Sequence, residues 1–247
     1  MNKCYTEKTI EINLNIKLTQ RSDMLSFGSD AVLISAFAAS FGKGRGADFG
    51  AGSGVISLLL AKKNHITGIE AVERNELLIP LIEKNILQNG IDKVKPVLSD
   101  VREYGERGLD FIVSNPPYLP KGSGIENLFS NNNDARRENN GTISDFVSSA
   151  SKALKQGGQF FCIYRPERLC DLIFAMKSNK IEPKRIINVY HTVQRPPCLV
   201  MVGGVKTGKS GVKISRPLVL FNNDGTRTGD SDSVNKNLML PEDIFKN

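Results

Sequence analysis

The 247-residue chain is poor in the features that mark membrane-inserted, secreted and disulfide-rich proteins. No apolar run approaches the roughly 18 residues that span a bilayer, and the amino terminus lacks the apolar core of a signal peptide. The four cysteines are widely spaced and form no C-x-x-C pair; they are Cys4, Cys162, Cys170 and Cys198. This spacing disfavours a disulfide framework or a zinc cluster and predicts a reducing, cytoplasmic environment.

Histidine is equally scarce. His65 and His191 are the two in the chain, and neither has a partner at metal-ligand spacing, so we expect no metal site and no catalytic histidine. Hydrophobic residues make up 40% and charged residues 24% of the chain, which is ordinary for a globular protein. This composition excludes a mostly disordered, collagen-like or coiled-coil chain, and the length favours one domain with appendages.

The net charge is +7, and the positive excess lies mainly in the second half of the chain. Residues 48–120 carry 8 basic and 10 acidic side chains, whereas residues 121–200 carry 12 basic and 7 acidic ones. This asymmetry suggests a polyanionic partner such as a nucleic acid. A solvated, lysine-rich surface explains it equally well, so charge alone leaves both alternatives open.

From residue 47 onward, strand patterns alternate with helix patterns. Seven strands are predicted, at 47–50, 66–70, 94–99, 109–114, 159–164, 185–190 and 198–205. The helices between them are predicted at 53–63, 73–89, 142–155 and 166–179. This alternation indicates βαβ units and a doubly wound α/β fold, with a mainly parallel sheet and helices on both faces. The seventh strand follows the short connection Arg195-Pro196-Pro197 rather than a helix, so we expect it to pair antiparallel.

The flanking regions suggest three parts of unequal size. Residues 1–29 form an extension with one half-exposed strand, 9–18, in which polar and apolar residues alternate. Residues 30–222 form the main domain, which begins with a helix. Within it, residues 121–141 form a long loop rich in glycine and asparagine, which is either functional or disordered. We expect residues 223–247 to be a polar, flexible tail.

A glycine-rich turn follows the first of the seven strands. The sequence Asp48-Phe49-Gly50-Ala51-Gly52-Ser53-Gly54 leads from strand to helix, which is the arrangement of nucleotide-binding folds. Its G-x-G-x-G spacing has neither the third glycine of a dinucleotide fingerprint nor the G-K-S/T of a P-loop. Asp48 would repel a pyrophosphate but would accept a hydrogen bond from an ammonium group. The alternative is an ordinary tight turn.

Two further acids stand where the next strands are predicted to end. Glu70 closes the second strand, and Asp100 follows the third. The turn and these acids resemble the cofactor motifs of class I S-adenosylmethionine-dependent methyltransferases. The resemblance implies S-adenosylmethionine as the cofactor and S-adenosylhomocysteine as the product. The residues it implies are Asp48, Gly50, Gly52 and Gly54 at the methionine part, Glu70 at the ribose and Asp100 at the adenine.

The fourth strand runs into Asn115-Pro116-Pro117-Tyr118. Ligands of open α/β sheets bind at the carboxyl ends of strands, and two prolines fix the backbone there. The Asn115 side-chain oxygen and the Pro116 carbonyl can accept hydrogen bonds from one amino group, and Tyr118 can stack on a flat ring. Two acceptors return the lone pair of a conjugated amine to its nitrogen, which then attacks a sulfonium methyl in line. We therefore predict Asn115, Pro116, Pro117 and Tyr118 as the catalytic residues.

Segments around these motifs narrow the resemblance. They are 27–33, 134–138, 154–158, 166–169, 182–185 and 195–197. Together with the motifs, they make residues 20–225 similar to the bacterial tRNA(Val) adenine(37)-N(6)-methyltransferase family. The resemblance implies a Rossmann-like class I methyltransferase fold, a tRNA substrate, and a monomer or weak dimer. It also places Asp30 in the cofactor site.

The family resemblance and the basic second half together suggest residues that contact RNA: Arg136, Arg137, Lys184, Arg185 and Arg195. The motif constrains the substrate less than the reaction, because Asn-Pro-Pro-Tyr also occurs in release-factor glutamine methyltransferases and in ribosomal RNA amino-methyltransferases. The former carry a helical domain before the glycine turn, and guanine-specific enzymes of the latter type usually have a duplicated core; the sequence has neither. A cofactor-binding regulator without catalysis is a further alternative, which the intact motif disfavours.

Overall fold

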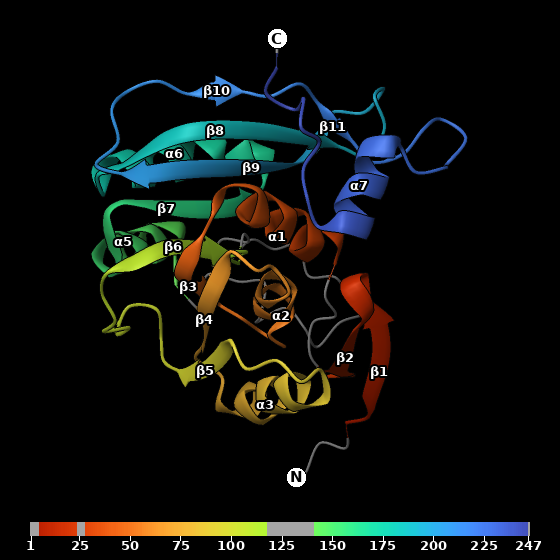
Figure 1. Cartoon of the computed structure of the whole chain (residues 1–247). Helices are drawn as coiled ribbons and strands as arrows, with labels where there is room; N and C mark the ends of the chain where they lie inside the picture. Colours follow the sequence, from red (N-terminus) through yellow and green to blue (C-terminus); the bar gives the residue numbers. More distant parts are fainter. Residues whose placement is uncertain (1–4, 24–27, 118–140, 247) are drawn as a thin grey trace.

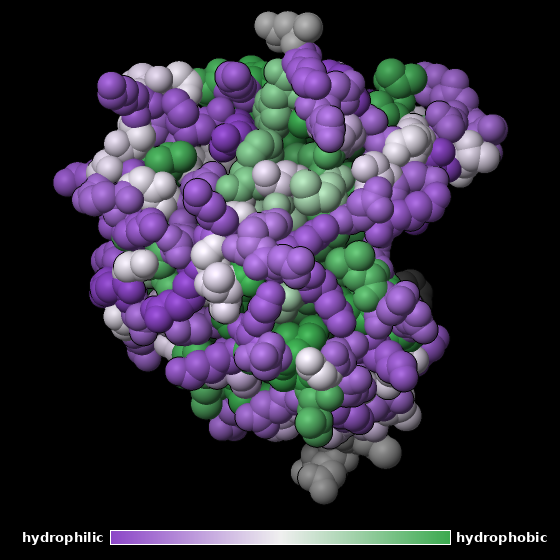
Figure 2. Space-filling model, in the orientation of Figure 1, coloured by the Kyte–Doolittle hydropathy of each residue, from purple (hydrophilic) through white to green (hydrophobic). Residues whose placement is uncertain are grey.

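The computed structural model of the chain describes residues 5–23, 28–117 and 141–246, and Figure 1 traces their path. Cys4, Tyr118, Arg136 and Arg137 lie outside the described residues, as does almost all of the loop predicted at 121–141. No helix in the described ranges has the length and apolarity needed to cross a bilayer. The face drawn in Figure 2 is mainly hydrophilic, with smaller hydrophobic areas between the polar side chains.

The amino-terminal extension forms a β-hairpin rather than the single strand that the alternating pattern predicts. β1 (Glu7–Ile12) pairs antiparallel with β2 (Ile16–Arg21), and a 3-10 turn, η1 (Asn13–Asn15), joins them. Leu14 and Asn15 have positive φ angles of 59° and 55°, which reverse the chain in the middle of the pattern. The alternation therefore identified extended backbone correctly but not the turn within it.

The main sheet has the strand order β10-β8-β9-β7-β6-β3-β4-β5, and β11 also pairs with β8. Its seven long strands are β3 (Gly44–Phe49), β4 (Ile66–Glu73), β5 (Val94–Leu98), β6 (Leu109–Ser114), β7 (Leu154–Tyr164), β8 (Ile181–Tyr190) and β9 (Pro197–Lys206). β9 pairs antiparallel with β7 and β8, and the pairs among β3 to β7 are parallel. The predicted seven strands with an antiparallel last strand are confirmed. Two short strands, β10 (Lys213–Ile214) and β11 (Leu218–Val219), extend the sheet along β8.

Helices cover both faces of the sheet, as the sequence predicts (Figure 1). They are α1 (Ser29–Phe41), α2 (Val55–Ala61), α3 (Ile79–Gln88), α5 (Ile143–Ala153), α6 (Leu169–Ser178) and α7 (Gly229–Asn237). Neighbouring strand residues point to opposite faces. Phe111 packs in the hydrophobic cluster with α1 and α2, whereas Ile112 packs in the cluster with α5 and α6. Because both faces are covered, the strand ends are where a ligand can bind.

The predicted helix at 73–89 starts later than expected. β4 continues to Glu73, and α3 begins at Ile79. Asn75 starts a 3-10 turn between them, because its side chain accepts a hydrogen bond from the Leu77 amide at 3.1 Å. Pro80 lies in the first turn of α3. Backbone amides there have no acceptor within the helix, so a proline costs no hydrogen bond. The position at which α3 begins thus depends on the capping residues rather than on the apolar periodicity.

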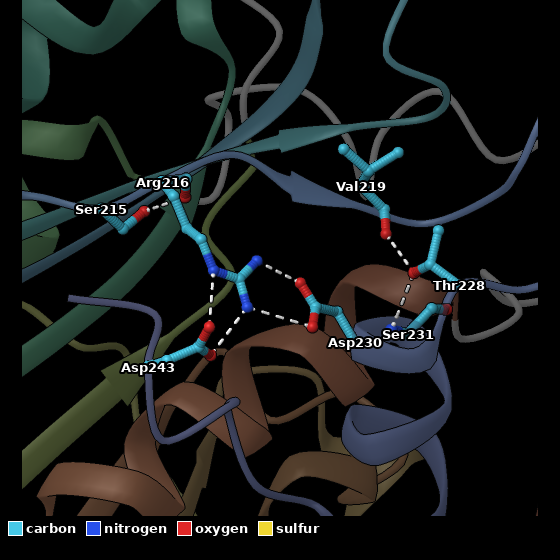
Figure 3. A network of polar contacts seen from close by, with 7 residues as sticks. All are labelled: Ser215, Arg216, Val219, Thr228, Asp230, Ser231 and Asp243. Carbon is cyan, nitrogen blue, oxygen red and sulfur yellow. Dashed lines mark hydrogen bonds and ion pairs between the residues drawn. The ribbon is translucent and has the colours of Figure 1, made fainter. Parts of the chain in front are cut away.

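The carboxyl-terminal segment is packed against the domain, which corrects the prediction of a flexible tail after residue 222. Leu238 and Ile244 are buried in the cluster that contains α1. Arg216 holds the segment together, because its guanidinium binds the carboxylate of Asp230 at 3.1 Å and that of Asp243 at 2.8 Å (Figure 3). Charge-assisted pairs of this kind are stronger than neutral ones. Apolar residues scattered through a polar sequence give no periodic signal, so the sequence did not reveal this packing.

Candidate active site

The loop between β3 and α2 has a backbone shape that requires its glycines. Gly50, Gly52 and Gly54 have φ angles of +78°, +59° and +82°, which residues with a Cβ rarely adopt. A Cβ at Gly52 would meet nothing within 4 Å, so the backbone there faces open space. The amides of Gly50 and Ala51 both donate to the Val72 carbonyl at 3.0 Å, which ties the loop to β4. The loop is therefore a fixed and open cradle of main chain.

Asp48, near the carboxyl end of β3, is fully buried. Its Oδ2 accepts a hydrogen bond from the Ser57 hydroxyl at 2.9 Å. Its Oδ1 has no partner among the described residues. Burial raises the pKa of this carboxyl to about 7. A buried acceptor without a donor is unfavourable, and the ammonium group of a ligand in the cradle would supply one.

Glu73, not Glu70, ends β4 beside the glycine loop. Its carboxylate accepts hydrogen bonds from the Gly52 amide at 2.9 Å and from the Asn75 amide at 2.8 Å. The side chain is 8% exposed, and burial raises its pKa. Glu70 lies three residues earlier, and its carboxylate accepts from the Tyr104 hydroxyl at 2.8 Å. The expectation that Glu70 closes the strand is therefore wrong, and sequence reasoning missed the acid at the strand end.

Asp100 follows β5 at the same edge of the sheet, as expected. The amide of Ser99 donates to the Glu73 carbonyl at 3.0 Å, which holds this strand end beside β4. Both carboxylate oxygens of Asp100 accept from Arg102, at 2.8 Å from Nε and at 2.7 Å from Nη2. These bonds lower the pKa of Asp100. Because a carboxylate has about four acceptor positions, Asp100 can accept from a ligand as well.

Asn115 follows β6, and Asp30 orients its side chain. The Asn115 Nδ2 donates to Asp30 Oδ2 at 3.1 Å, which leaves the other amide atom, Oδ1, to act as an acceptor. Asp30 lies in the first turn of α1, where the helix dipole favours a carboxylate. The Ser114 hydroxyl donates to the Phe49 carbonyl at 2.8 Å, so the end of β6 is joined to the start of the glycine loop. The structure thus brings Asp30, expected among the cofactor residues, into contact with Asn115.

The turn after Asn115 is firmly seated. Pro116 is buried and Pro117 is half-buried, and both have the fixed φ of proline. Because Pro117 follows, Pro116 is also restricted to the extended region, which limits the direction of its carbonyl. The stacking role of Tyr118 stays a prediction, because that residue lies outside the described part of the chain.

The three described residues among those predicted to bind RNA, Lys184, Arg185 and Arg195, do not gather at one place. Arg195 lies after β8, at the edge of the sheet that carries Asn115. Lys184 and Arg185 lie towards the other end of β8. There, Lys184 donates to the Lys209 carbonyl at 3.0 Å, and the Arg185 guanidinium lies 4.0 Å from the Phe41 ring centroid. These two side chains are thus engaged away from the candidate site.

Asn85 on α3 is a buried polar residue that sequence reasoning missed. Its Oδ1 accepts from the Thr19 amide at 2.8 Å, and its Nδ2 donates to the carbonyls of Thr19 and Ser53 at 3.0 Å each. One side chain therefore joins the hairpin, α3 and the glycine loop. No motif surrounds Asn85; a polar residue on the apolar face of an amphipathic helix was the available signal.

Comparison with known families agrees with this geometry. Residues 22–180 match the family model described as the methyltransferase small domain, a range that includes the glycine loop, the acids and Asn115. The chain belongs to this family. Membership implies that it is an S-adenosylmethionine-dependent methyltransferase.

Curated relatives have a more specific name. A protein from a Flavobacteriaceae bacterium (strain 3519-10), named tRNA1(Val) (adenine(37)-N6)-methyltransferase, is 25% identical over 235 residues, which cover 92% of this chain and 84% of that protein. A protein of the same name from Escherichia coli O157:H7 is 27% identical over 150 residues, 59% of this chain and 60% of that protein. The family resemblance seen in the sequence is confirmed at this modest identity.

Solved structures support the fold. A crystal structure of a predicted O-methyltransferase from Agrobacterium tumefaciens superposes with a TM-score of 0.68 at 18% identity, covering 86% of this chain and 97% of that one. At such low identity the likeness concerns architecture only. It confirms the predicted class I methyltransferase fold.

Proposed function

We propose that this protein transfers a methyl group from S-adenosylmethionine to N6 of adenosine 37, next to the anticodon of a valine tRNA. The observation that carries the proposal is the Asn115 side chain, which Asp30 holds at 3.1 Å with Oδ1 left as an acceptor. This side chain stands at the strand end that is joined to the glycine loop. An amine acceptor beside a cofactor cradle suits an amino-methyltransferase.

The residues at the sheet edge fit the cofactor in charge and in shape. Open main chain at Gly52 leaves room for the methionine part, and Asp48 Oδ1 suits its ammonium group. We assign the ribose hydroxyls to Glu73 in place of Glu70, because Glu73 lies at the strand end. Asp100 is assigned to the adenine amine. When bound, S-adenosylmethionine supplies an activated methyl group on a sulfonium sulfur.

The contribution of the protein's own residues is to position the target amine and to orient its lone pair. Asn115 Oδ1 and the Pro116 carbonyl accept the two amine hydrogens, which favours a pyramidal nitrogen. The nitrogen would become cationic as it takes the methyl group, while the carbon–sulfur bond breaks and S-adenosylhomocysteine is the leaving group. The same two acceptors stabilise that charge until the nitrogen loses one proton to solvent. Asp30 matters because a rotated Asn115 amide would present Nδ2, a donor that repels the amine hydrogens.

Support for a tRNA substrate comes from the names of the relatives and from the distribution of charge. An adenine in an anticodon loop is unpaired, so moving it into a pocket requires less energy than extruding a base from a duplex. We keep Arg136, Arg137 and Arg195 as proposed phosphate contacts. Lys184 and Arg185 are withdrawn because they lie away from the site.

The proposal is tested by incubating the protein with radiolabelled S-adenosylmethionine and, separately, with total tRNA and with a release factor. The tRNA is then digested to nucleosides, which are identified by chromatography and mass spectrometry. We expect label in N6-methyladenosine. Label only in the release factor would move the substrate to a glutamine amide. Cofactor binding without label in either substrate would favour a non-catalytic protein.

A further inference from the structure

A recess of about 620 Å³ lies at the carboxyl end of β8. Two turns form it: 191–196, between β8 and β9, and 221–227, which follows β11. Its lining includes His191, Gln194, Arg195, Phe221, Asn222 and Asn223. β9 is antiparallel to both β7 and β8, so β8 runs in the same direction as β7 and β6. The recess is therefore at the same sheet edge as Asn115.

The side chains of the recess are of kinds that bind nucleotides. The ring centroids of His191 and Phe221 lie 4.8 Å apart with an interplanar angle of 42°. The Arg227 guanidinium lies 5.6 Å from the Phe221 centroid. Aromatic rings and guanidinium planes stack on bases, an amide such as that of Gln194 reads base edges, and Arg195 attracts phosphate. Among the described residues, no acid lines the recess.

Hydrogen bonds hold the two turns in place without a ligand. The Phe221 amide donates to the His191 carbonyl at 2.9 Å, which joins one turn to the other. The Asn222 amide donates to the Thr226 carbonyl at 2.8 Å. Asp224, the acid of the second turn, accepts from the amide of Thr226 at 2.9 Å and from its hydroxyl at 2.6 Å. Groups that are ordered in advance lose less entropy when a ligand binds.

The position of the recess suits an RNA strand that also reaches the candidate active site. β7 and β9 separate β6 from β8, so three strand spacings of about 4.8 Å put about 14 Å between β6 and β8 across the sheet. By the strand register, Ser114 is level with Ile186, so His191 lies about 13 Å farther than Asn115 along the strand direction. Nucleotides of one stacked strand follow each other at about 3.4 Å. The two displacements combine to about 19 Å, which corresponds to between about five and six stacked nucleotides, and to fewer in an extended strand.

We infer that the recess is a second binding site, which takes a single-stranded nucleotide a few positions away from the target adenosine. This inference rests on the proposed function, because it requires an RNA substrate. It gives His191 a role as a stacking ring rather than as a metal ligand. It also gives the packed carboxyl-terminal segment, which carries Phe221, a part in substrate binding.

The test compares two recess variants, His191→Ala and Phe221→Leu, with the control Phe174→Ala, which removes a ring that is 73% exposed on α6. The probe is an unmodified valine tRNA transcript. Loss of stacking should raise the Kd and the KM for this tRNA by about 5- to 150-fold. The kcat at saturating tRNA and the Kd for S-adenosylmethionine should not change. Phe221→Tyr, which keeps the ring, and the control should both behave as wild type.

Ultraviolet cross-linking of the wild-type complex, followed by mass spectrometry, should place a nucleotide on the peptides that contain His191 or Phe221. If the wild type methylates the tRNA while both recess variants keep its KM, the recess inference is overturned and the proposed function stands. If the wild type labels only the release factor, both are overturned. Unchanged melting temperatures and cofactor affinity in the variants exclude misfolding as the cause of a raised KM.

Discussion

The two halves of the sheet's carboxyl edge carry opposite charge. In the half formed by β3, β4 and β5, the strand ends bear Asp48, Glu73 and Asp100, and the first two are buried. In the half formed by β7 and β8, Arg165 and Arg195 follow the strands, and Arg195 is exposed. Asn115 and Asp30 lie between the two halves.

The difference in burial implies a difference in how the two halves hold a ligand. Salt screens buried charges weakly, so buried carboxylates are suited to holding a cation at a defined place. Exposed guanidiniums attract over about 8–10 Å and are screened by salt. Under the proposed function, the acidic half binds a cationic cofactor and the basic half a polyanionic substrate. The charge asymmetry of the sequence then reflects two ligands with different needs.

The largest expected effect is at the boundary between the halves. Asn115→Ala removes one of the two acceptors for the target amine, and we expect kcat to fall by roughly a hundred- to a thousandfold, or about 2.7–4 kcal/mol. The Kd for S-adenosylmethionine, measured by calorimetry, should stay the same. Asp30→Ala should lower kcat less, because Asn115 is still present but its amide can rotate. A weakened cofactor affinity in Asn115→Ala would place this residue in the cofactor site instead.

Asp48, in the acidic half, should destabilise the cofactor-free protein at neutral pH. The folded-state pKa of Asp48, about 7, is higher than the unfolded value of about 3.9. The folded state thus binds the proton more tightly, and stability falls as pH rises from about 4 to about 7. In urea unfolding without cofactor, the stability advantage of Asp48→Asn over wild type should be about 3 kcal/mol larger at pH 8 than at pH 5.

A matched control for this prediction is Asp224→Asn. Hydrogen bonds from Thr226 lower the pKa of Asp224, so its charged form stabilises the fold above about pH 4 and the sign is opposite. Equal effects of Asp48→Asn at pH 5 and pH 8 would contradict the account of Asp48. The same substitution should weaken cofactor binding, because it removes the negative charge that suits the ammonium group.

The two glutamates of β4 provide a matched pair for the cofactor assignment. Glu73→Gln should weaken S-adenosylmethionine binding by about 1.5–3 kcal/mol, the value of a hydrogen bond to a charged group. Glu70→Gln should change it little, because Glu70 bonds to Tyr104 and lies before the strand end. Isothermal titration of both variants decides between them, and the reverse order of effects would restore Glu70 as the ribose ligand.

The smallest expected effect concerns salt. The logarithm of the binding constant for valine tRNA should fall by about 0.7 per phosphate contact for each tenfold rise in salt concentration. The binding constant for the cofactor should change little. Arg195→Gln should reduce the slope of this salt dependence by the share of about one phosphate contact. Lys184→Gln should leave the slope unchanged. Filter binding at several salt concentrations measures both. Equal slopes for the two variants would remove Arg195 from the RNA surface.

Local rules predicted a large part of the site. Glycines spaced for a tight turn do have positive φ angles, and Asn115 does stand at the end of a strand, because short motifs determine their own backbone. The choice between Glu70 and Glu73 was different. It depends on how far β4 extends, which is set by contacts with other segments: the Val72 carbonyl accepts from the Gly50 and Ala51 amides, and Glu73 pairs with Leu98 of β5. Pairing of that kind is not visible in a single segment of sequence.

Long-range pairing also explains why the structure of the carboxyl-terminal segment could not be predicted from the sequence. His191 and Phe221 are far apart in sequence, and they meet because β11 pairs with β8. β11 is two residues long, too short for an alternating pattern. The packing of α7 likewise depends on a few apolar residues and on the pairs made by Arg216. The main sheet could therefore be predicted from the sequence, but the segment that packs along its edge could not.

The most direct test of the central claim uses one valine tRNA transcript and its A37→G variant with the purified protein and S-adenosylmethionine. Mass spectrometry of nuclease fragments locates any added methyl group. We predict about one methyl group per molecule, as N6-methyladenosine at position 37, and none on the variant transcript. Equal methylation of both transcripts, or methylation of neither, would contradict the account.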